Sequence, residues 1–350
     1  MAKVTINIVA QHAGVSKKTV SRVLNDEPNV SEQTKLKVQE VFKKLGYRPS
    51  PVARGLATNQ SFLIGLVYDN PNKSYVSDVQ NGALSRCQKY GYHLVIQPAD
   101  HESEHLLTQI EALWVESRLD GLVLTPPFSD MEPLLAMLDN LGAKYVRIGS
   151  TRLNRQKSFN ENSELVQTKS VISNDQAATR EMTNYLISLG HNDIAFIKGH
   201  PDHPVSEQRY QGYLEALEEN RIALNPERVT EGKFDFQSGE IAARYLLNGE
   251  SRPTAILASN DYMAAGVLKV ASQKKISVPH SLSVVGFDNA PISEYIWPSL
   301  TTVKQPIYDM AARAIALLIG KEVSEEPTES PICLASQLVI RESTAPPINN

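Results

Sequence analysis

Short apolar runs separated by longer amphipathic stretches dominate the chain from residue 62 onward. The runs are continuous and too short for helices, which is typical of buried parallel strands. They lie at 62–68, 92–97, 121–125, 144–148, 194–198, 255–259 and 283–287. Stretches with helical spacing lie between them, at 76–90, 103–117, 174–190, 207–220 and 261–274. This alternation predicts an α/β fold of doubly wound parallel sheets over residues 62–350, which we call the body.

Residues 1–48, which we call the head, show a purely helical pattern instead. Three apolar sets recur at helical spacing: Ile6, Val9, Ala10 and Ala13; Val20, Val23 and Leu24; Val38, Val41, Phe42 and Leu45. Gly14 and Gly46 end the first and third helices, since glycine readily adopts the left-handed conformation of a helix C-terminus. Thr5, Ser16 and Ser31 precede the three helices as N-caps. Two short helices around a glycine turn, braced by a third, predict a helix-turn-helix.

Residues 49–61 join the head to the body. Pro51 suits a first helical position after Ser50, so residues 51–57 can form about two helical turns. Such a helix is too short to be stable alone, and Gly55 within it costs roughly 1 kcal/mol more. We expect a hinge segment that becomes helical only when something holds it, with a plain linker as the alternative.

Length and composition describe a globular chain of more than one domain. The 350 residues are 41% hydrophobic and 21% charged, which suits two or three folded units. No apolar run is long enough to span a bilayer, and the N-terminal residues lack a signal-peptide pattern, so we expect a cytoplasmic protein with no membrane partner. Cys87 and Cys333 are too few for a disulfide framework or a four-ligand zinc site. We therefore expect no metal and no cofactor.

The net charge of -4 hides an asymmetry between the two ends of the chain. Residues 1–60 hold ten Lys or Arg and four Asp or Glu, whereas the remainder holds 25 and 35. A basic head on an acidic body indicates that the head alone meets a polyanion. A helix-turn-helix places the first turn of its second helix against base edges in the DNA major groove. Lys17, Lys18 and Arg22 lie on that helix and can donate to guanine; a merely solvated basic face is the alternative.

The stretch "VAQHAGVSKKTVSRVLN", followed by "VSEQTKLKVQEVFKKLGYRPSPVARGLA", closely resembles the head of the LacI–GalR family of bacterial transcription regulators. The resemblance continues through "SFLIGLV", "LISLGHNDIAFI", "RYQGYLEAL", "ASNDYMAAGVL", "SVVGFDN" and "PSLTTVKQP", and so covers nearly the whole chain. It implies a homodimer on double-stranded operator DNA, with paired hinge helices in the minor groove and Leu56 wedged between base steps. The DNA-contacting residues expected on this basis are Thr5, Ser16, Lys17, Lys18, Thr19, Ser21, Arg22, Asn25, Asn29, Ser31, Ala53 and Leu56.

The resemblance also implies a body like a periplasmic sugar-binding protein, with two lobes, three crossovers and an effector in the cleft between them. The N-lobe is expected at about 62–173 and 304–335, and the C-lobe at about 174–303 and 336–343. Family tetramers add a C-terminal leucine-heptad helix, whereas "LVIRESTAPPINN" contains prolines and no heptad, so we expect a dimer.

Polar residues follow several of the predicted strands, where ligands of doubly wound sheets bind. These residues are Asp69, Thr125, Asn260, Asp261 and Asp288, with Arg209 near the start of a helix. By resemblance, Arg209, Asn260 and Asp288 match residues of the family's cleft, and Asp69, Phe234 and Gln305 fall at positions that line it. Tyr75 is a further candidate.

Carboxylates, an arginine, an amide and an aromatic ring suit a polyol, so we expect a small-molecule effector that is a sugar. Each residue also has a local alternative: a turn for Asp288, a helix cap for Asn260 and the core for Phe234. The purine-responsive branch has a second cleft arginine shortly before the one matching Arg209, and "HPDHPVSEQR" lacks it. That departure disfavours a nucleobase effector.

The expected function is a sequence-specific repressor of carbohydrate-use genes, released from a palindromic operator by its sugar. A corepressor-dependent regulator with a nucleobase or other effector is the alternative. An enzyme is a weaker alternative, because "GHPDHP" is a proline-punctuated loop and no G-x-S-x-G, Walker-type or H-E-x-x-H pattern occurs. A sugar-binding protein of a transport system would fit the body but not the basic head.

Overall fold

A computed structural model of the chain describes residues 4–24, 30–47, 60–70, 72–150, 156–157, 166–167, 169–249, 251–320 and 331–348. The chain divides into two compact units, Met1–Phe62 and Leu63–Asn350, and each is described in its own right. Among the described residues, no helix combines the length and the apolar character needed to cross a bilayer.

The first unit contains the three predicted helices, α1 (Ile6–Ala13), α2 (Lys17–Leu24) and α3 (Glu32–Leu45). Their apolar faces meet in one small core, whose fully buried members are Val9, Ala13, Val20 and Val38. Gly14 and Gly46 end α1 and α3 with φ of 61° and 59°, as the left-handed C-cap requires. The helix-turn-helix prediction is therefore confirmed.

Two of the three predicted caps form hydrogen bonds. The Ser16 hydroxyl accepts from the backbone N–H of Thr19 at 3.1 Å, and the Ser31 hydroxyl accepts from that of Thr34 at 3.3 Å. Thr5 occupies the N-cap position of α1 with extended backbone, as predicted, but its side chain makes no capping bond. Four expected DNA contacts lie outside the described residues: Asn25, Asn29, Ala53 and Leu56. Most of the hinge segment 49–61 does too.

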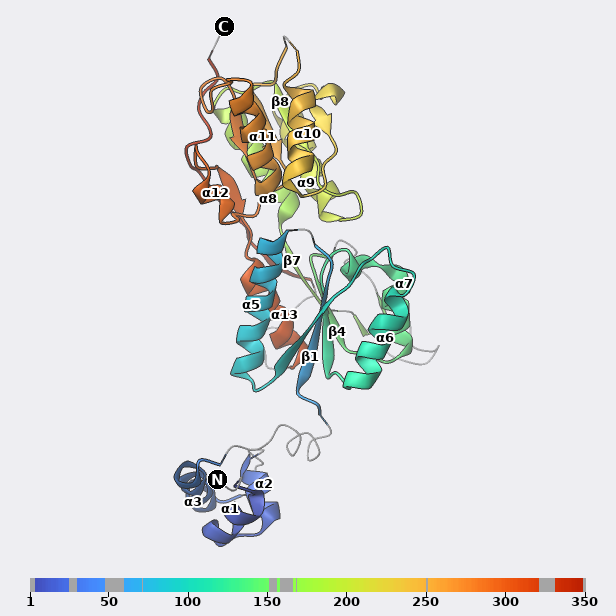
Figure 1. Ribbon diagram of the computed structural model, residues 1–350, viewed down its shortest axis with the longest axis vertical. Coiled ribbons are helices and arrows are strands. Elements are labelled where there is room, and N and C mark those ends of the chain that lie inside the picture. The colour runs from blue at the N-terminus through green and yellow to red at the C-terminus, as the bar shows by residue number, and fades with distance from the viewer. Residues whose placement is uncertain are drawn as a thin grey trace. The chain divides into compact units, whose positions relative to one another are not determined.

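The N-lobe of the body is built on a six-stranded sheet of order β13-β7-β4-β3-β1-β2, parallel throughout. Its strands are β1 (Leu63–Tyr68), β2 (His93–Pro98), β3 (Gly121–Leu124), β4 (Tyr145–Ile148), β7 (Ser170–Ser173) and β13 (Ile332–Leu334). One face is covered by α5 (Lys73–Lys89) and α13 (Ile307–Leu318), and the other by α6 (Leu106–Ser117) and α7 (Glu132–Asn140) (Figure 1). Because both faces are covered, β3 and β4 are buried along their whole length.

The C-lobe has a four-stranded parallel sheet of order β11-β10-β8-β9. The strands are β8 (Ile194–Ile197), β9 (Val229–Thr230), β10 (Ala255–Ala258) and β11 (Ser283–Val285). The helices α8 (Asp175–Ser188) and α9 (Val205–Glu219) pack on one face, and α10 (Phe236–Leu246) and α11 (Asp261–Gln273) pack on the other (Figure 1).

The chain passes between the lobes three times, near residues 173–175, 304–307 and 334–337. The last two crossings flank an antiparallel pair, β12 (Thr302–Lys304) with β14 (Gln337–Val339). The remaining elements are short: α12 (Ile292–Tyr295), the 3₁₀ turns Phe128–Asp130 and Pro226–Arg228, and the β5–β6 pair at Gln156–Lys157 and Val166–Gln167. The predicted α/β class with parallel sheets is confirmed, and the strands that the sequence pattern did not predict are short or half polar, such as β7 and β13.

Candidate functional site

The first turn of α2 presents basic side chains to solvent. Lys17 and Lys18 are exposed, whereas Val20 and Val23 on the same helix face the core of the head. The capping bond from Ser16 fixes where this helix starts, and the hydroxyls of Ser16 and Thr19 are themselves hydrogen-bonded at 2.9 Å. The cap thus sets the start of the helix so that both lysines lie on its first turn. In a helix-turn-helix, the first turn of the second helix is the part that contacts base edges.

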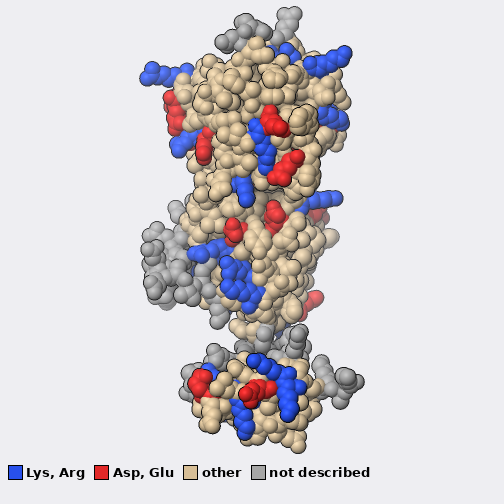
Figure 2. All heavy atoms as spheres, turned by 90° about the vertical axis from the view of Figure 1, so that its left-hand side faces the viewer, with Lys and Arg blue, Asp and Glu red and all other residues tan. Residues whose placement is uncertain are grey.

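Basic residues outnumber acidic ones in the described part of the head. Seven Lys or Arg stand there against Glu32 and Glu40, and Figure 2 shows Lys and Arg side chains spread over the face of the head that it displays. Ser21 and Arg22 are half-buried on α2, next to the apolar face, and Ser31 is exposed at the start of α3. A positively charged surface of this kind attracts phosphates irrespective of sequence, and the exposed first turn of α2 adds the groups that can select bases.

A cavity of about 520 Å³, counted out to solvent, lies between the two lobes of the body at the C-terminal ends of the strands. Both lobes and the crossovers line it with polar and aromatic side chains. The lining residues are Asn70, Asn72, Tyr75, Pro126, Gly149, Ser173, Asp175, His203, Val205, Arg209, Phe234, Asn260, Asp288, Gln305 and Met310. Six of the eight residues predicted for the cleft are therefore brought together here: Tyr75, Arg209, Phe234, Asn260, Asp288 and Gln305.

Arg209 is the centre of a buried network in this cavity. Its Nε and Nη2 both lie 2.9 Å from Oδ2 of Asp175, and its Nη1 lies 3.6 Å from Oδ1 of Asp288 and donates to the carbonyl of Ser259. The guanidinium also lies over the ring of Phe287, 3.9 Å from its centroid. Arg209 is only 4% exposed, so these partners offset the cost of burying its charge. Asp175 was not among the predicted site residues, because its position as the first residue of α8 suggests only a helix start.

Asp288 comes after β11 and is held in an unusual backbone conformation, with φ of 105°. Its Oδ2 accepts a 2.9 Å hydrogen bond from Nδ2 of Asn72, which belongs to the other lobe. Burial raises the pKa of this carboxyl, the attraction of Arg209 opposes that rise and the charge of Asp175 adds to it, so that the pKa is about 7. Asp288 is thus a carboxyl that faces both a cation and the opposite wall of the cleft. Its backbone conformation costs free energy, and the surrounding structure holds it in place.

Asn260 and Phe234 combine a local role with a place in the cavity wall. The Asn260 side chain caps α11, accepting from the N–H of Met263 at 2.9 Å, and its amide donates to the carbonyl of Phe234 at 2.7 Å. Phe234 is 6% exposed and belongs to the C-lobe core, yet its ring borders the cavity. Asn260 is therefore a helix cap and Phe234 a core residue, as the local alternatives predicted. Both residues also line the cavity.

Two residues predicted for the cleft do not line the cavity. Asp69 follows β1 as expected, but its carboxylate turns to His101, accepting from the backbone N–H at 3.0 Å and lying 2.7 Å from Nδ1. Thr125 is fully buried and donates its hydroxyl to the carbonyl of Val67, so the adjacent Pro126 lines the cavity instead. In both cases a nearby partner satisfies the polar group and turns it away from the cavity.

The structure adds Asn72 and His203 to the site. Asn72 caps α5 with its side-chain oxygen, which leaves its amide N–H₂ to reach Asp288. His203 is 4% exposed, packs edge-on against Phe234 with ring centroids 5.5 Å apart, and has its pKa lowered to about 4, first by burial and then by the neighbouring imidazoles of His200 and His101. It is therefore a neutral imidazole in the cavity wall, in a loop that the sequence pattern describes only as proline-rich.

Comparisons with known proteins agree with this arrangement. Residues 5–50 match the family model described as bacterial regulatory proteins, lacI family, and residues 183–344 match the periplasmic binding protein-like domain. The HTH-type transcriptional repressor PurR of Histophilus somni (strain 2336) is 34% identical over 342 residues, covering 97% of this chain and 98% of that protein.

Solved structures extend the likeness over both units. The Lac repressor dimer bound to operator and the anti-inducer ONPF is 28% identical with a TM-score of 0.76, covering 98% of this chain and 100% of that one. The complex of the transcriptional regulator CelR with cellobiose is 28% identical with a TM-score of 0.70, covering 97% and 99%. The chain belongs to the LacI family of bacterial regulatory proteins. It is a DNA-binding transcriptional repressor and not an enzyme.

Proposed function

We propose that this repressor is released from a palindromic operator by a neutral sugar bound in the inter-lobe cavity. The observation that carries the proposal is the group formed by Asp288, Arg209 and Asn72, in which polar groups from both lobes converge in one cavity. A sugar hydroxyl both donates and accepts, so it can replace the Asn72 bond to Asp288 while bonding Arg209.

The charge and shape of the lining favour a neutral polyol over an anion. Two buried carboxylates, Asp175 and Asp288, surround the single guanidinium of Arg209, so a phosphate or carboxylate ligand would meet net repulsion. The rings of Phe234 and Tyr75 border the cavity and can cover the apolar face of a pyranose or furanose. Burial, followed by the charges of Asp175 and Asp288, raises the pKa of the Tyr75 hydroxyl, which therefore stays a hydrogen-bond donor.

Release of DNA requires the sugar to prefer the state with low operator affinity. The cavity lies between lobes that three crossovers connect, so a ligand that touches both walls selects one separation of the lobes. In the proposed dimer two heads bind the two half-sites, with α2 in the major groove and Leu56 of each hinge segment in the minor groove. Such a regulator works in the cytoplasm, where the operator is.

The test separates sugar binding from operator binding. Asp288→Ala and Arg209→Ala are expected to keep wild-type operator affinity and to lose roughly ten- to a hundredfold in sugar affinity, because a charged hydrogen bond to a bound ligand contributes about 1.5–3 kcal/mol. The sugar is first found by a thermal-shift screen of mono- and disaccharides, and both affinities are then measured on the purified variants. Asp309→Ala and Arg244→Ala, at exposed positions of the body, are the matched controls.

A purely structural role predicts the opposite outcome. If Asp288 and Arg209 only hold the C-lobe together, the substitutions lower the melting temperature and weaken operator binding while the sugar affinity of the folded fraction stays unchanged. Unchanged sugar affinity in both variants would rule out the cleft assignment.

A nucleobase effector is the second candidate, because the PurR relative is 34% identical over 97% of this chain. The stretch from Gly199 to Arg209 contains no second arginine, and His203 stands in the cavity wall instead. Hypoxanthine and guanine belong in the same thermal-shift screen. A nucleobase that stabilises the protein and tightens operator binding would replace the sugar proposal and reverse the sign of regulation.

A further inference from the structure

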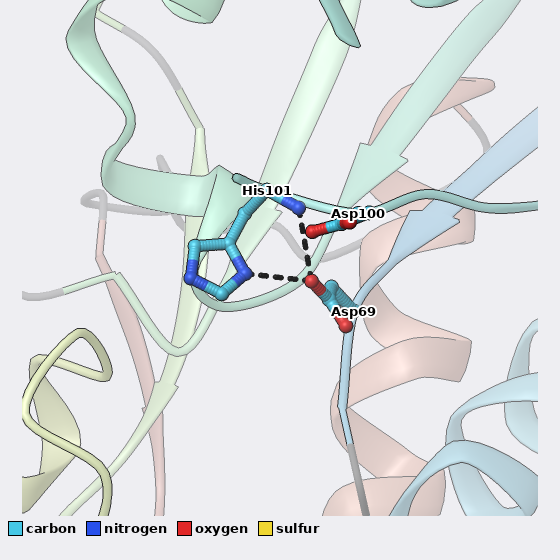
Figure 3. Close-up of side chains that lie close together, drawn as sticks. All are labelled: Asp69, Asp100 and His101. Atoms are coloured by element: carbon cyan, nitrogen blue, oxygen red, sulfur yellow. Dashed lines mark hydrogen bonds and ion pairs between the residues drawn. The ribbon is translucent and has the colours of Figure 1, made fainter. Parts of the chain in front are cut away.

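A second cluster of chemically active side chains lies in the body outside the cavity lining. His101 and Glu102 follow β2 in the N-lobe, Asp69 follows β1, and Asp202 lies in the loop between β8 and α9 of the C-lobe. Figure 3 shows the carboxylate of Asp69 turned toward the ring of His101, with Asp100 beside them. The cluster therefore joins loops from both lobes.

Asp69 determines which nitrogen of His101 is available. Its Oδ2 accepts the backbone N–H of His101 at 3.0 Å and lies 2.7 Å from Nδ1 of the same residue. A carboxylate only accepts hydrogen bonds, so the ring carries its proton on Nδ1. The lone pair of the neutral ring then lies on Nε2, as in histidines that a carboxylate orients for a metal ion.

Nε2 of His101 faces carboxylates at distances that a metal ion can bridge. Oδ2 of Asp202 lies 3.5 Å away, and one ring nitrogen of His101 and one carboxylate oxygen each of Glu102 and Asp202 all lie within 4.8 Å of one another. Two ligands bound tetrahedrally to Zn²⁺ at about 2.0–2.2 Å are about 3.3–3.6 Å apart. His200 is not counted as a ligand, because its Nδ1 accepts from the backbone N–H of Asp202 at 3.2 Å and so helps to fix that loop.

We propose that His101, Glu102 and Asp202 bind a Zn²⁺ ion that bridges the two lobes. The ligands are Nε2 of His101 and one carboxylate oxygen from each acidic residue, with water in the fourth position, and Asp69 orients the imidazole. One imidazole with oxygen donors favours Zn²⁺ over Mg²⁺ or Ca²⁺, which prefer oxygen ligands alone. Because Asp202 belongs to the other lobe, the bound ion ties the lobes together next to the cavity wall formed by His203. This site does not depend on which effector the cavity takes.

Zinc binding is measured by equilibrium dialysis of the purified full-length chain against ZnCl₂, with melting temperature as a second readout. The wild type is expected to bind one ion per chain and to melt at higher temperature as zinc is added. His101→Ala and Asp202→Asn should weaken binding at least about tenfold, and Asp69→Asn about 10- to 100-fold, the range for residues that orient a ligand. Without zinc, all three variants should melt close to the wild type, since their side chains are partly or largely exposed.

The control is His105→Ala, at an exposed histidine four residues from His101. It should leave zinc affinity unchanged, which distinguishes the site from general binding to surface histidines. The proposal is overturned if His101→Ala or Asp202→Asn binds zinc as the wild type does, or if His105→Ala loses binding equally. Equal affinity for Mg²⁺ or Ca²⁺, unaffected by His101→Ala, would likewise show that the imidazole is not a ligand.

Discussion

Two opposing effects, burial and a nearby cation, act on the charge of Asp288. Burial disfavours the carboxylate, and Arg209, 3.6 Å away, favours it. Burial has the larger effect, so the pKa rises to about 7. Near neutral pH the residue can therefore donate or accept a hydrogen bond, and both modes suit a sugar hydroxyl.

A raised pKa means that the folded chain binds the Asp288 proton more tightly than the unfolded chain. The stabilisation from that proton is complete below the unfolded pKa near 3.8 and is lost as pH rises toward 7. Asp288→Asn removes this dependence, so its melting temperature relative to wild type should rise between pH 4 and pH 7 and then level off. Thermal unfolding across that range checks this prediction, with Asp309→Asn as the exposed control. A difference that does not change with pH would contradict it.

The helix α2 both packs against the core of the head and presents basic side chains to solvent. Val20 and Val23 anchor it in the head, and Lys17 and Lys18 are exposed to solvent on its first turn. Since a helix-turn-helix reads bases from that turn, these lysines are expected to select sequence rather than only to attract phosphate.

Lys18→Ala should weaken binding to the cognate operator by roughly 1–3 kcal/mol and relax base preference, with a smaller loss on random DNA. Lys37→Ala, on α3, should weaken binding to both DNAs about equally if it has any effect. Gel shifts with both DNAs at one salt concentration make the comparison. Equal losses on both for Lys18→Ala would show that it contacts phosphate alone.

The caps of the head helices differ although their residues are chemically alike. Ser31 bonds the N–H of Thr34, whereas Thr5 bonds no N–H of α1. Ser31→Ala should therefore destabilise α3 by about 1 kcal/mol, and Thr5→Ala should have a much smaller effect on α1. Hydrogen exchange of the first-turn amides in the full-length chain measures both. Equal losses of protection at the two helices would contradict the assigned caps.

At the scale of the whole molecule, the C-lobe exposes two neighbouring aromatic residues more fully than any other large apolar residue described. Tyr295 is 82% exposed and Trp297 is 84% exposed, and Ile340 on the neighbouring C-terminal segment is 58% exposed. Arg341 ties that segment to the loop through Glu294, at 3.1 Å. Exposed aromatic side chains gathered in this way are typical of protein interfaces. The N-lobe helix α5 also exposes an apolar side chain, that of Leu84.

We expect light scattering to give a mass of two chains at micromolar concentration. Replacing Tyr295 and Trp297 together by serine should raise the dimer dissociation constant by about tenfold or more, since buried aromatic residues commonly dominate interface energies. Ile241→Ser, at another exposed apolar position, is the control. A monomer in the wild type, or an unchanged dimer in the double variant, would show that this surface is not the interface.

The sequence by itself determined the class of the fold and the position of most of the site. Continuous apolar runs predicted the central strands, because those strands are covered on both faces. Glycines and serines predicted where the head helices end and begin, because turns and caps depend on local chemistry. The rule that ligands bind at strand ends then selected Asn260 and Asp288, and the family resemblance added Gln305.

Only the tertiary structure decided which polar groups meet. Asp175 reaches Arg209 across 34 residues of chain, and Asn72 reaches Asp288 across 216. Asp69, correctly placed after its strand, turns to His101 because that histidine offers two donors within 3.0 Å. Local patterns predict on which element a side chain lies and at which end of that element. Its partner depends on how distant elements pack, and that packing is determined by the burial of the core as a whole.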